Sequence, residues 1–249
     1  MRSFSPRYAI ISDIHSNLAA VRVVLDAIAA DGVAATFCLG DLVGYGPNPH
    51  EVVKEIEGLP LHCIRGNHDR YALDLSSDDI RAATSEAIEF TKRTLTPADV
   101  SFLKGLPDST TFDDRVLLVH GSPRNPDEYI VSGEVAVASY KHFRDHYAGM
   151  WLCLFGHTHV PMIIGDGRVV RQIEPNSTVK LKPRMPYLIN PGSVGQPRDG
   201  NPEAAYGILD LDEYTMTFRR VPYDVEDTHR RILEAGLQRH LGDRLRVGK

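Results

Sequence analysis

The chain has 249 residues and a formal net charge of −5, with ordinary apolar and charged fractions. This length is sufficient for a substantial hydrophobic core, and no apolar run approaches the ~18 residues of a membrane span. The polar start of the chain does not resemble a signal peptide, so we expect a cytoplasmic protein with one domain over residues 1–249. The acidic charge gives no support for general nucleic-acid binding. The composition does not determine the oligomeric state.

Short apolar runs recur along the chain, and each is followed by residues that can bind a metal ion. Such runs, bounded by turn residues, are typical of strands buried on both faces. In open α/β sheets, ligands bind beyond the carboxyl ends of the strands, so the pattern predicts a metal site at one rim. The runs cover residues 8–11, 34–39, 61–64, 116–119 and 150–155, and the residues that follow are Asp13 and His15, Asp41, Asn67, His120, and His157 and His159.

Helix signals separate the first three runs. Asn17 predicts the start of a helix over 18–31, with Gly32 at its end. Asn48-Pro49 predicts the start of a second helix. This βαβαβ order is typical of a parallel sheet covered by helices. Residues 77–106 are helical in character, and their second half opens at Thr96-Pro97.

After His159 the chain becomes rich in short β-type runs. They predict a second, largely antiparallel sheet, followed by a closing helix over 225–241. The β-type runs cover residues 162–164, 169–170, 187–190, 204–209 and 215–218. His62 falls inside a predicted strand and is expected to pack in the core.

The predicted ligands combine carboxylate and amide oxygens with imidazole nitrogens. Asp13 and His15 would project to the same side of an extended segment. Such mixed sets suit Mn²⁺, Fe²⁺/³⁺, Zn²⁺, Co²⁺ or Ni²⁺ rather than Ca²⁺ or an all-oxygen Mg²⁺ site. Seven ligands are too many for one tetrahedral zinc ion. Two ions sharing the carboxylate of Asp41 would accommodate them, at the ~3.5–4 Å separation usual in two-metal hydrolases.

A charge count indicates what such a centre would hold. Two divalent ions, two aspartates and a bridging hydroxide leave a small net positive charge in a water-poor pocket. That charge favours phosphoryl oxygens and the charge that develops during phosphoryl transfer. Each ion also lowers the pKa of a shared water, which supplies hydroxide as the nucleophile.

The ordered set of motifs resembles the signature of the calcineurin-like metallophosphoesterases. Residues 40–47 and 190–198 extend the resemblance to small bacterial phosphodiesterases and diadenosine-tetraphosphatase-related proteins. The resemblance implies an α/β fold, a four-layer αββα sandwich of two packed mixed sheets flanked by helices. The motifs are Asp13-Ile14-His15, Gly40-Asp41, Gly66-Asn67-His68-Asp69, His120-Gly121 and Gly156-His157-Thr158-His159.

The same resemblance implies a role for each motif residue. One ion would be held by Asp13, His15, Asp41 and His159, and the other by Asp41, Asn67, His120 and His157. His68 would contact the substrate phosphate and stabilise or protonate the leaving oxygen. Asp69 would either orient His68 through a hydrogen bond or cap the following helix.

Three further residues are candidates for substrate contacts. Arg65 and Arg198 could each bind phosphate through two hydrogen bonds, although an exposed arginine is the commoner case. Tyr45 could line the pocket or simply fill a Gly-Tyr-Gly-Pro turn.

These observations predict a dinuclear metal-dependent phosphoesterase with two divalent transition-metal ions, Mn²⁺ being favoured. Its substrate would be a small phosphodiester or phosphomonoester, nucleotide-derived esters included, attacked by a metal-bridging hydroxide. Two alternatives stay open at this stage. One is a non-catalytic interaction scaffold that keeps this fold, and the other is a nuclease.

Overall fold

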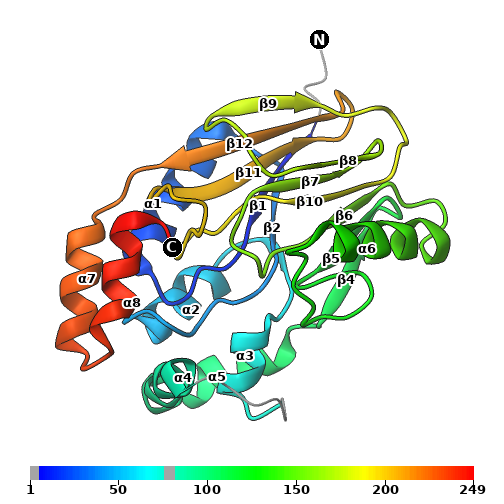
Figure 1. Cartoon of the computed structure of the whole chain (residues 1–249). Helices are drawn as coiled ribbons and strands as arrows, with labels where there is room; N and C mark the ends of the chain where they lie inside the picture. Colours follow the sequence, from blue (N-terminus) through cyan, green and yellow to red (C-terminus); the bar gives the residue numbers. More distant parts are fainter. Residues whose placement is uncertain (1–5, 76–81) are drawn as a thin grey trace.

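The computed structural model describes residues 6–75 and 82–249. Two mixed six-stranded sheets lie face to face, with helices on their outer faces (Figure 1). The first sheet has the order β3 (Leu61–Cys63), β2 (Ala35–Cys38), β1 (Arg7–Ile11), β11 (Ala204–Asp210), β12 (Thr215–Val221) and β9 (Ser177–Lys180). The second has the order β4 (Ser109–Phe112), β5 (Val116–Val119), β6 (Leu152–Leu154), β10 (Tyr187–Asn190), β7 (Met162–Gly165) and β8 (Arg168–Val170). The predicted sandwich of two mixed sheets is confirmed.

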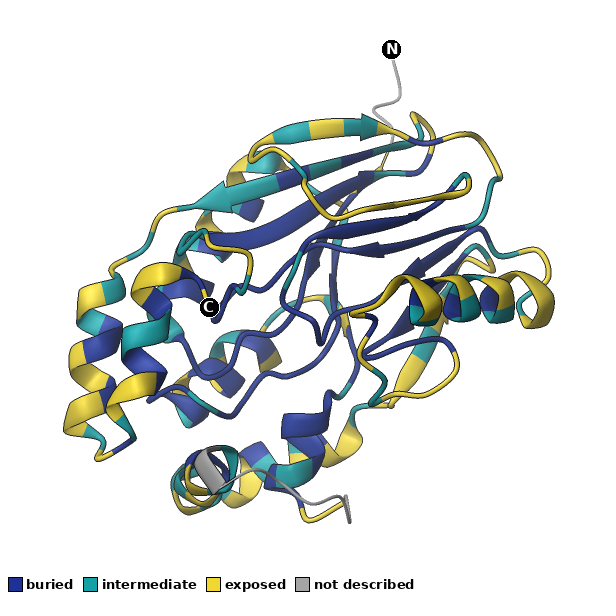
Figure 2. Cartoon of the chain, in the orientation of Figure 1, coloured by how far each residue is buried: buried dark blue, intermediate teal, exposed yellow. Residues whose placement is uncertain are grey.

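The helices complete the outer layers. Those described are α1 (Leu18–Asp31), α2 (Pro49–Glu57), α3 (Asn67–Ala72), α4 (Ala82–Thr94), α5 (Pro97–Gly105), α6 (Gly133–His146), α7 (Val225–Glu234) and α8 (Arg239–Asp243), followed by the 3₁₀ helix η1 (Arg244–Val247). No helix in the described residues is both long enough and apolar enough to cross a membrane. Figure 2 shows their solvent-facing sides exposed and the strands between them largely buried.

The four layers follow from the alternation of side chains along β1. Tyr8 and Ile10 point into the apolar core between the two sheets. Ala9 and Ile11 point the other way, into the core beneath α1 and α2. Because successive residues of a strand face opposite sides, a strand that is apolar throughout requires a packed layer on both faces.

The predicted helix boundaries are largely confirmed. Asn17 Oδ1 accepts a hydrogen bond from Ala20 N at 3.1 Å, and Gly32 ends α1 with a left-handed φ of 63°. Helix α5 begins at Pro97 after the cap residue Thr96. Asn48 occupies the cap position of α2, but its side chain makes no cap hydrogen bond.

Three expectations are wrong. The later strands do not form a separate sheet, because β11 pairs with β1 and β10 pairs with β6, which distributes them over both sheets. The closing helix is divided into α7 and α8, with Gly236 in a left-handed conformation at the break. His62 is exposed, at the edge of the first sheet, with its ring 5.1 Å from that of Phe112.

Candidate metal centre

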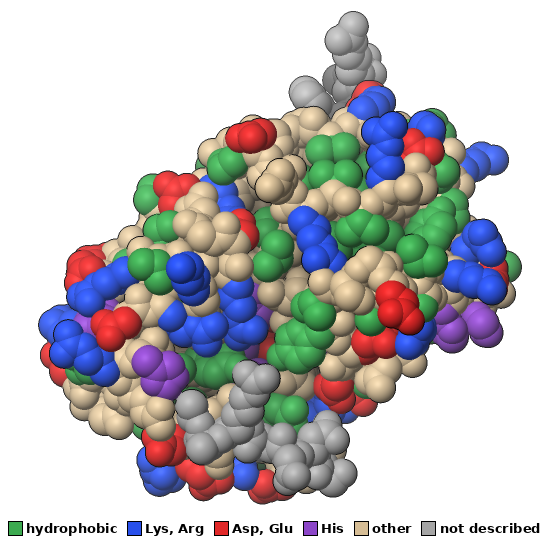
Figure 3. Space-filling view, viewed as in Figure 1, with side chains coloured by type: hydrophobic (Ala, Val, Ile, Leu, Met, Phe, Trp, Pro, Cys, Tyr) green, Lys and Arg blue, Asp and Glu red, His purple; other side chains and the backbone are tan. Residues whose placement is uncertain are grey.

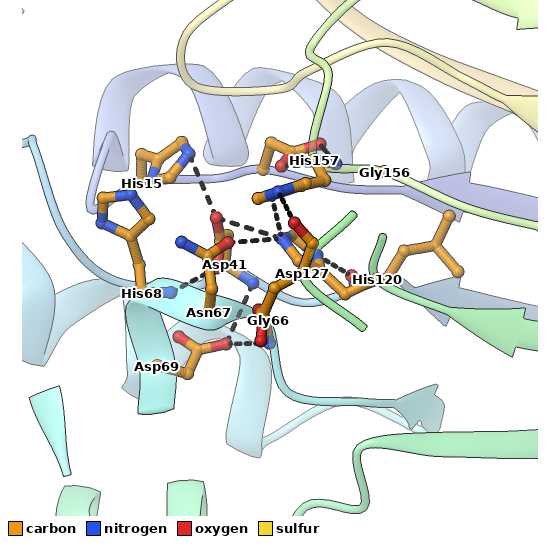
Figure 4. Close-up of polar contacts among 12 residues, drawn as sticks. His15, Asp41, Gly66, Asn67, His68, Asp69, His120, Asp127, Gly156 and His157 are labelled. Carbon is orange, nitrogen blue, oxygen red and sulfur yellow. Dashed lines mark hydrogen bonds and ion pairs between the residues drawn. The ribbon is translucent and has the colours of Figure 1, made fainter. Parts of the chain in front are cut away.

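The seven predicted ligands lie in the segments that follow β1, β2, β3, β5 and β6. All seven are buried. Figure 4 shows several of them around Asp41. Two groups have ligand atoms within 4.8 Å of one another, and Asn67 Oδ1 adjoins the second group, 3.0 Å from His120 Nε2. The groups are Asp13, His15, Asp41 and His159, and Asp41, His120 and His157.

Asp41 lies between the two groups. Its Oδ2 is 3.6 Å from His15 Nε2 and 3.3 Å from His120 Nε2. Its Oδ1 accepts a hydrogen bond from the backbone N–H of His68 at 2.8 Å, which orients the carboxylate. One carboxylate therefore faces imidazoles of both groups, as an ion-bridging residue must.

Backbone carbonyls determine how the four histidines are oriented. A carbonyl oxygen can only accept, so the ring nitrogen facing it must carry the proton. In a neutral imidazole the other nitrogen then presents its lone pair to the centre, the usual arrangement for a histidine ligand. The contacts are His15 Nδ1 with Val43 O, His120 Nδ1 with Leu39 O, His157 Nε2 with Asp127 O, and His159 Nδ1 with Gln196 O.

The remaining ring nitrogens face one another in pairs. His15 Nε2 and His159 Nε2 are 3.0 Å apart, and His120 Nε2 and His157 Nδ1 are 3.1 Å apart. Burial lowers the pKa values of His15 and His159 well below the usual range, so this pair is neutral and its lone pairs oppose each other. A cation near both nitrogens would relieve that repulsion.

His120 differs from the other three histidines. Burial alone would lower its pKa, but the Asp41 carboxylate, together with Asp13 and the Leu39 carbonyl, outweighs burial and raises the pKa to about 9. This part of the pocket therefore attracts positive charge. The protein groups fit divalent cations with mixed nitrogen and oxygen ligands.

The ligand loops have unusual backbone conformations. Asp13, His15, Asp41, His157 and His159 all have left-handed φ values, between 48° and 65°. The spacing of Asp13 and His15 predicted an extended segment, and this prediction is wrong. The two residues nevertheless belong to the same group. Each such residue costs of order 1–3 kcal/mol, and conformations of this kind cluster at functional sites.

His68 lies beside the centre, at the start of α3 (Figure 4). Its buried ring is 4.7 Å from that of His15 and 4.3 Å from that of Tyr45. Its Nδ1 is buried and has no hydrogen-bond partner among the described residues. Burial lowers its pKa to about 4. Gly44 packs directly on the ring, and a Cβ at that position would clash with His68 Nδ1.

Asp69 does not orient His68 through a hydrogen bond. Its Oδ2 accepts from Gly66 N and Asp41 N at 2.9 Å, which also caps α3. Its Oδ1 accepts from two further amides, Leu42 N at 2.9 Å and Val43 N at 3.1 Å. The buried carboxylate thus holds the loop that carries Asp41, the residue shared by the two groups.

The three candidate substrate residues are placed differently. Tyr45 contacts His15 and His68, and Arg198 Cζ lies 5.8 Å from the centre of the Tyr45 ring. Arg65 instead pairs with Asp108 at 3.2 Å, in the turn before β4.

A further aromatic residue adjoins the centre without any signal in the sequence. The Tyr129 ring stacks on His157 with ring centres 3.6 Å apart, and the residue is 43% exposed. It follows His120 by nine residues and belongs to no motif, so sequence reasoning had nothing with which to find it.

Fold and site together define an α/β protein with a buried His/Asp centre consistent with two metal ions. The sequence matches the calcineurin-like phosphoesterase superfamily domain over residues 7–214, and the chain belongs to that family. It is 35% identical over 246 residues to the uncharacterized protein MJ0912 of Methanocaldococcus jannaschii, covering 97% of this chain and 98% of that protein. It is 24% identical over 211 residues to the phosphodiesterase YfcE of Escherichia coli K12, covering 81% of this chain and 85% of YfcE.

A solved structure shows the same fold over almost the whole chain. A metallophosphoesterase from Sphaerobacter thermophilus superposes with a TM-score of 0.86 at 35% identity, covering 98% of this chain and 100% of that one.

Proposed function

We propose that this protein is a dinuclear metal-dependent phosphoesterase that hydrolyses small phosphodiesters or phosphomonoesters. The observation that carries the proposal is the set of inward-facing histidine nitrogens around Asp41, each held in place by a backbone carbonyl on the other side of its ring. The name of the relative YfcE supports including phosphodiesters among the substrates.

Asp13, His15, Asp41 and His159 would hold one ion, and Asp41, Asn67, His120 and His157 the other. Bound divalent ions would supply Lewis acidity towards phosphoryl oxygens and would lower the pKa of water. The mixed ligands fit Mn, Fe, Zn, Co or Ni, and we favour Mn²⁺ for the first assays.

His68 would act on the phosphate without binding a metal. Its ring adjoins His15, and its backbone N–H already orients the Asp41 carboxylate. A ring N–H aimed at a phosphoryl or leaving oxygen would stabilise charge that develops there as a water oxygen bonds to phosphorus and the ester bond breaks. Asp69 acts one step further away, through the loop that carries Asp41.

Tyr45 and Arg198 would form part of the pocket wall. The Tyr45 ring contacts both His15 and His68, and Arg198 lies against that ring. Arg65 is less suited to a substrate contact, because its guanidinium already pairs with Asp108.

The test is a turnover assay on p-nitrophenyl phosphate and bis(p-nitrophenyl) phosphate, with Mn²⁺ and with a chelator. We expect hydrolysis that the chelator abolishes and that added metal restores. The Asp41→Ala variant is the control for contaminating phosphatases, because it lacks the shared ligand. Absence of turnover with every metal tried would contradict the proposal, as would equal activity in the variant.

A further inference from the structure

One tyrosine adjoins each of the two groups of predicted ligands. Tyr45 contacts His15, with ring centres 4.7 Å apart. Tyr129 stacks on His157, with ring centres 3.6 Å apart and an angle of 28° between the ring planes. His15 and His157 belong to different groups, so the two tyrosines border different parts of the centre.

The C-terminal helices cover the part of the centre at Tyr45. Leu241 and Leu245 belong to a small apolar cluster against which Tyr45 packs. Both leucines line a cavity of only about 10 Å³ together with Tyr45 and His15. Because such a cavity has room for about one water molecule, it cannot take the organic part of an ester.

Tyr129, in contrast, is open to solvent. The residue is 43% exposed although one face of its ring lies on His157, so its exposed area lies on the remaining face and the edges of the ring. The other two rings that contact a predicted ligand without being one, in the described part of the chain, are the half-buried Tyr45 and the buried His68. In Figure 3, histidine is partly visible between Lys and Arg side chains on the side of the C-terminal helices and hydrophobic side chains on the side of the second sheet.

Hydrogen bonds hold the loop that carries Tyr129, residues 122–131. Ser122 Oγ donates to the carboxylate of Glu128 at 2.6 Å. Asp127 O lies 3.1 Å from His157 Nε2, which ties the loop to the metal centre next to the tyrosine. An aromatic side chain on a loop that is already fixed loses little conformational entropy when a ligand binds to it.

The predicted metal ligands are buried, so the organic part of a bound ester must extend from the centre towards solvent. The cavity at Tyr45 is too small for it, whereas Tyr129 presents an open aromatic surface directly beside a ligand. Aromatic rings prefer offset-stacked or edge-to-face contacts with other rings, and such contacts add to the effect of apolar burial.

We propose that Tyr129 is a specificity residue whose open ring surface packs on a flat aromatic group of the substrate while the phosphate lies at the metal centre. This inference rests on the proposed function and adds a residue that favours aromatic over small aliphatic groups. The alternative, in which Tyr129 only supports His157, is an outcome of the test below.

The test compares phenylphosphonate with methylphosphonate, which differ only in the organic group and contain no ester bond to hydrolyse. Their dissociation constants are measured by titration calorimetry on the Mn²⁺-loaded protein with metal in excess. We expect phenylphosphonate to bind about 3- to 10-fold tighter, the effect of one aromatic contact. In Tyr129→Ala that ratio should fall close to one, chiefly through weaker phenylphosphonate binding. Tyr129→Phe should keep the ratio, because it retains the ring.

Val131→Ala is the matched control, since Val131 is a 60% exposed apolar residue of the same loop. It should keep the wild-type ratio, and melting temperatures establish that each variant is folded. Loss of affinity in Tyr129→Ala by the same factor for both ligands would show that Tyr129 only supports His157, and would overturn the inference. Loss of the ratio in Tyr129→Phe or in Val131→Ala would overturn it too, as would a wild type that binds both ligands equally or neither. Calorimetry needs no turnover, whereas a wild type inactive on aryl esters would contradict the proposed function instead.

Discussion

The two sheets contribute unlike halves of the candidate metal centre. Loops after strands of the first sheet supply both carboxylates, the amide and one imidazole, and loops after strands of the second supply three imidazoles. The contacts cross the sandwich, because Asp41 faces His120 at 3.3 Å and Asp13 faces His159 at 3.4 Å. Neither sheet holds a complete ligand set, so the centre depends on how the sheets are packed.

The most severe way to break this arrangement is Asp41→Ala, which removes the residue that both groups share. We expect loss of both ions and a fall in activity of about 10⁴-fold or more, since groups that act as a unit fail together. Elemental analysis of the purified variant measures the stoichiometry. Two metal equivalents per chain in Asp41→Ala would refute the shared role.

His68→Ala tests a residue that contacts His15 and Asp41 but belongs to neither ligand group. We expect kcat to fall roughly 10²–10⁴-fold, the range for a group that transfers or shares a proton in the transition state. Metal content should stay at the wild-type value, because the side chain of His68 contacts the His15 ring without completing the ligand set. Near-full activity would remove His68 from the mechanism.

Gly44→Ala should displace the His68 ring without removing it. A Cβ at Gly44 would clash with His68 Nδ1, and we expect kcat to fall about 10- to 100-fold, less than in His68→Ala. The control is Gly32→Ala, which places alanine at a similarly left-handed φ, where no described atom lies within 4 Å of the added Cβ. Both variants lose some stability to backbone strain, but only Gly44→Ala should lose activity. Equal kcat values would mean that the ring position does not matter.

The meeting of these polar residues at one site was predictable because the signal is local. Asp13 and His120 each follow a buried strand, and in α/β sheets ligands bind at that end of the strands. The division of these strands between two sheets was not predictable, since it depends on β11 pairing with β1 across almost two hundred residues.

The role of Asp69 could not be predicted from the sequence either, although the residues involved are close along the chain. Its position next to His68 suggested a hydrogen bond between the two side chains. In the folded chain four backbone amides converge on the carboxylate instead, three of them from the Asp41 loop. Sequence proximity identified a relevant residue but not the group on which it acts.

The smallest expected effect is on thermal stability, and it tests whether bound ions stabilise both sheets together. Ions that bind the native centre but not the unfolded chain stabilise by about 2.7 kcal/mol at a free concentration one hundred times the dissociation constant. For a chain of this size that corresponds to a melting temperature lower by about 5–10 °C after chelation. Calorimetric scans with and without chelator measure the shift, which Asp41→Ala should not show. Because the ligands come from both sheets, the shift should appear in one cooperative transition. A chelator-dependent change in only part of the unfolding curve would mean that the ions stabilise one sheet and not the junction between them.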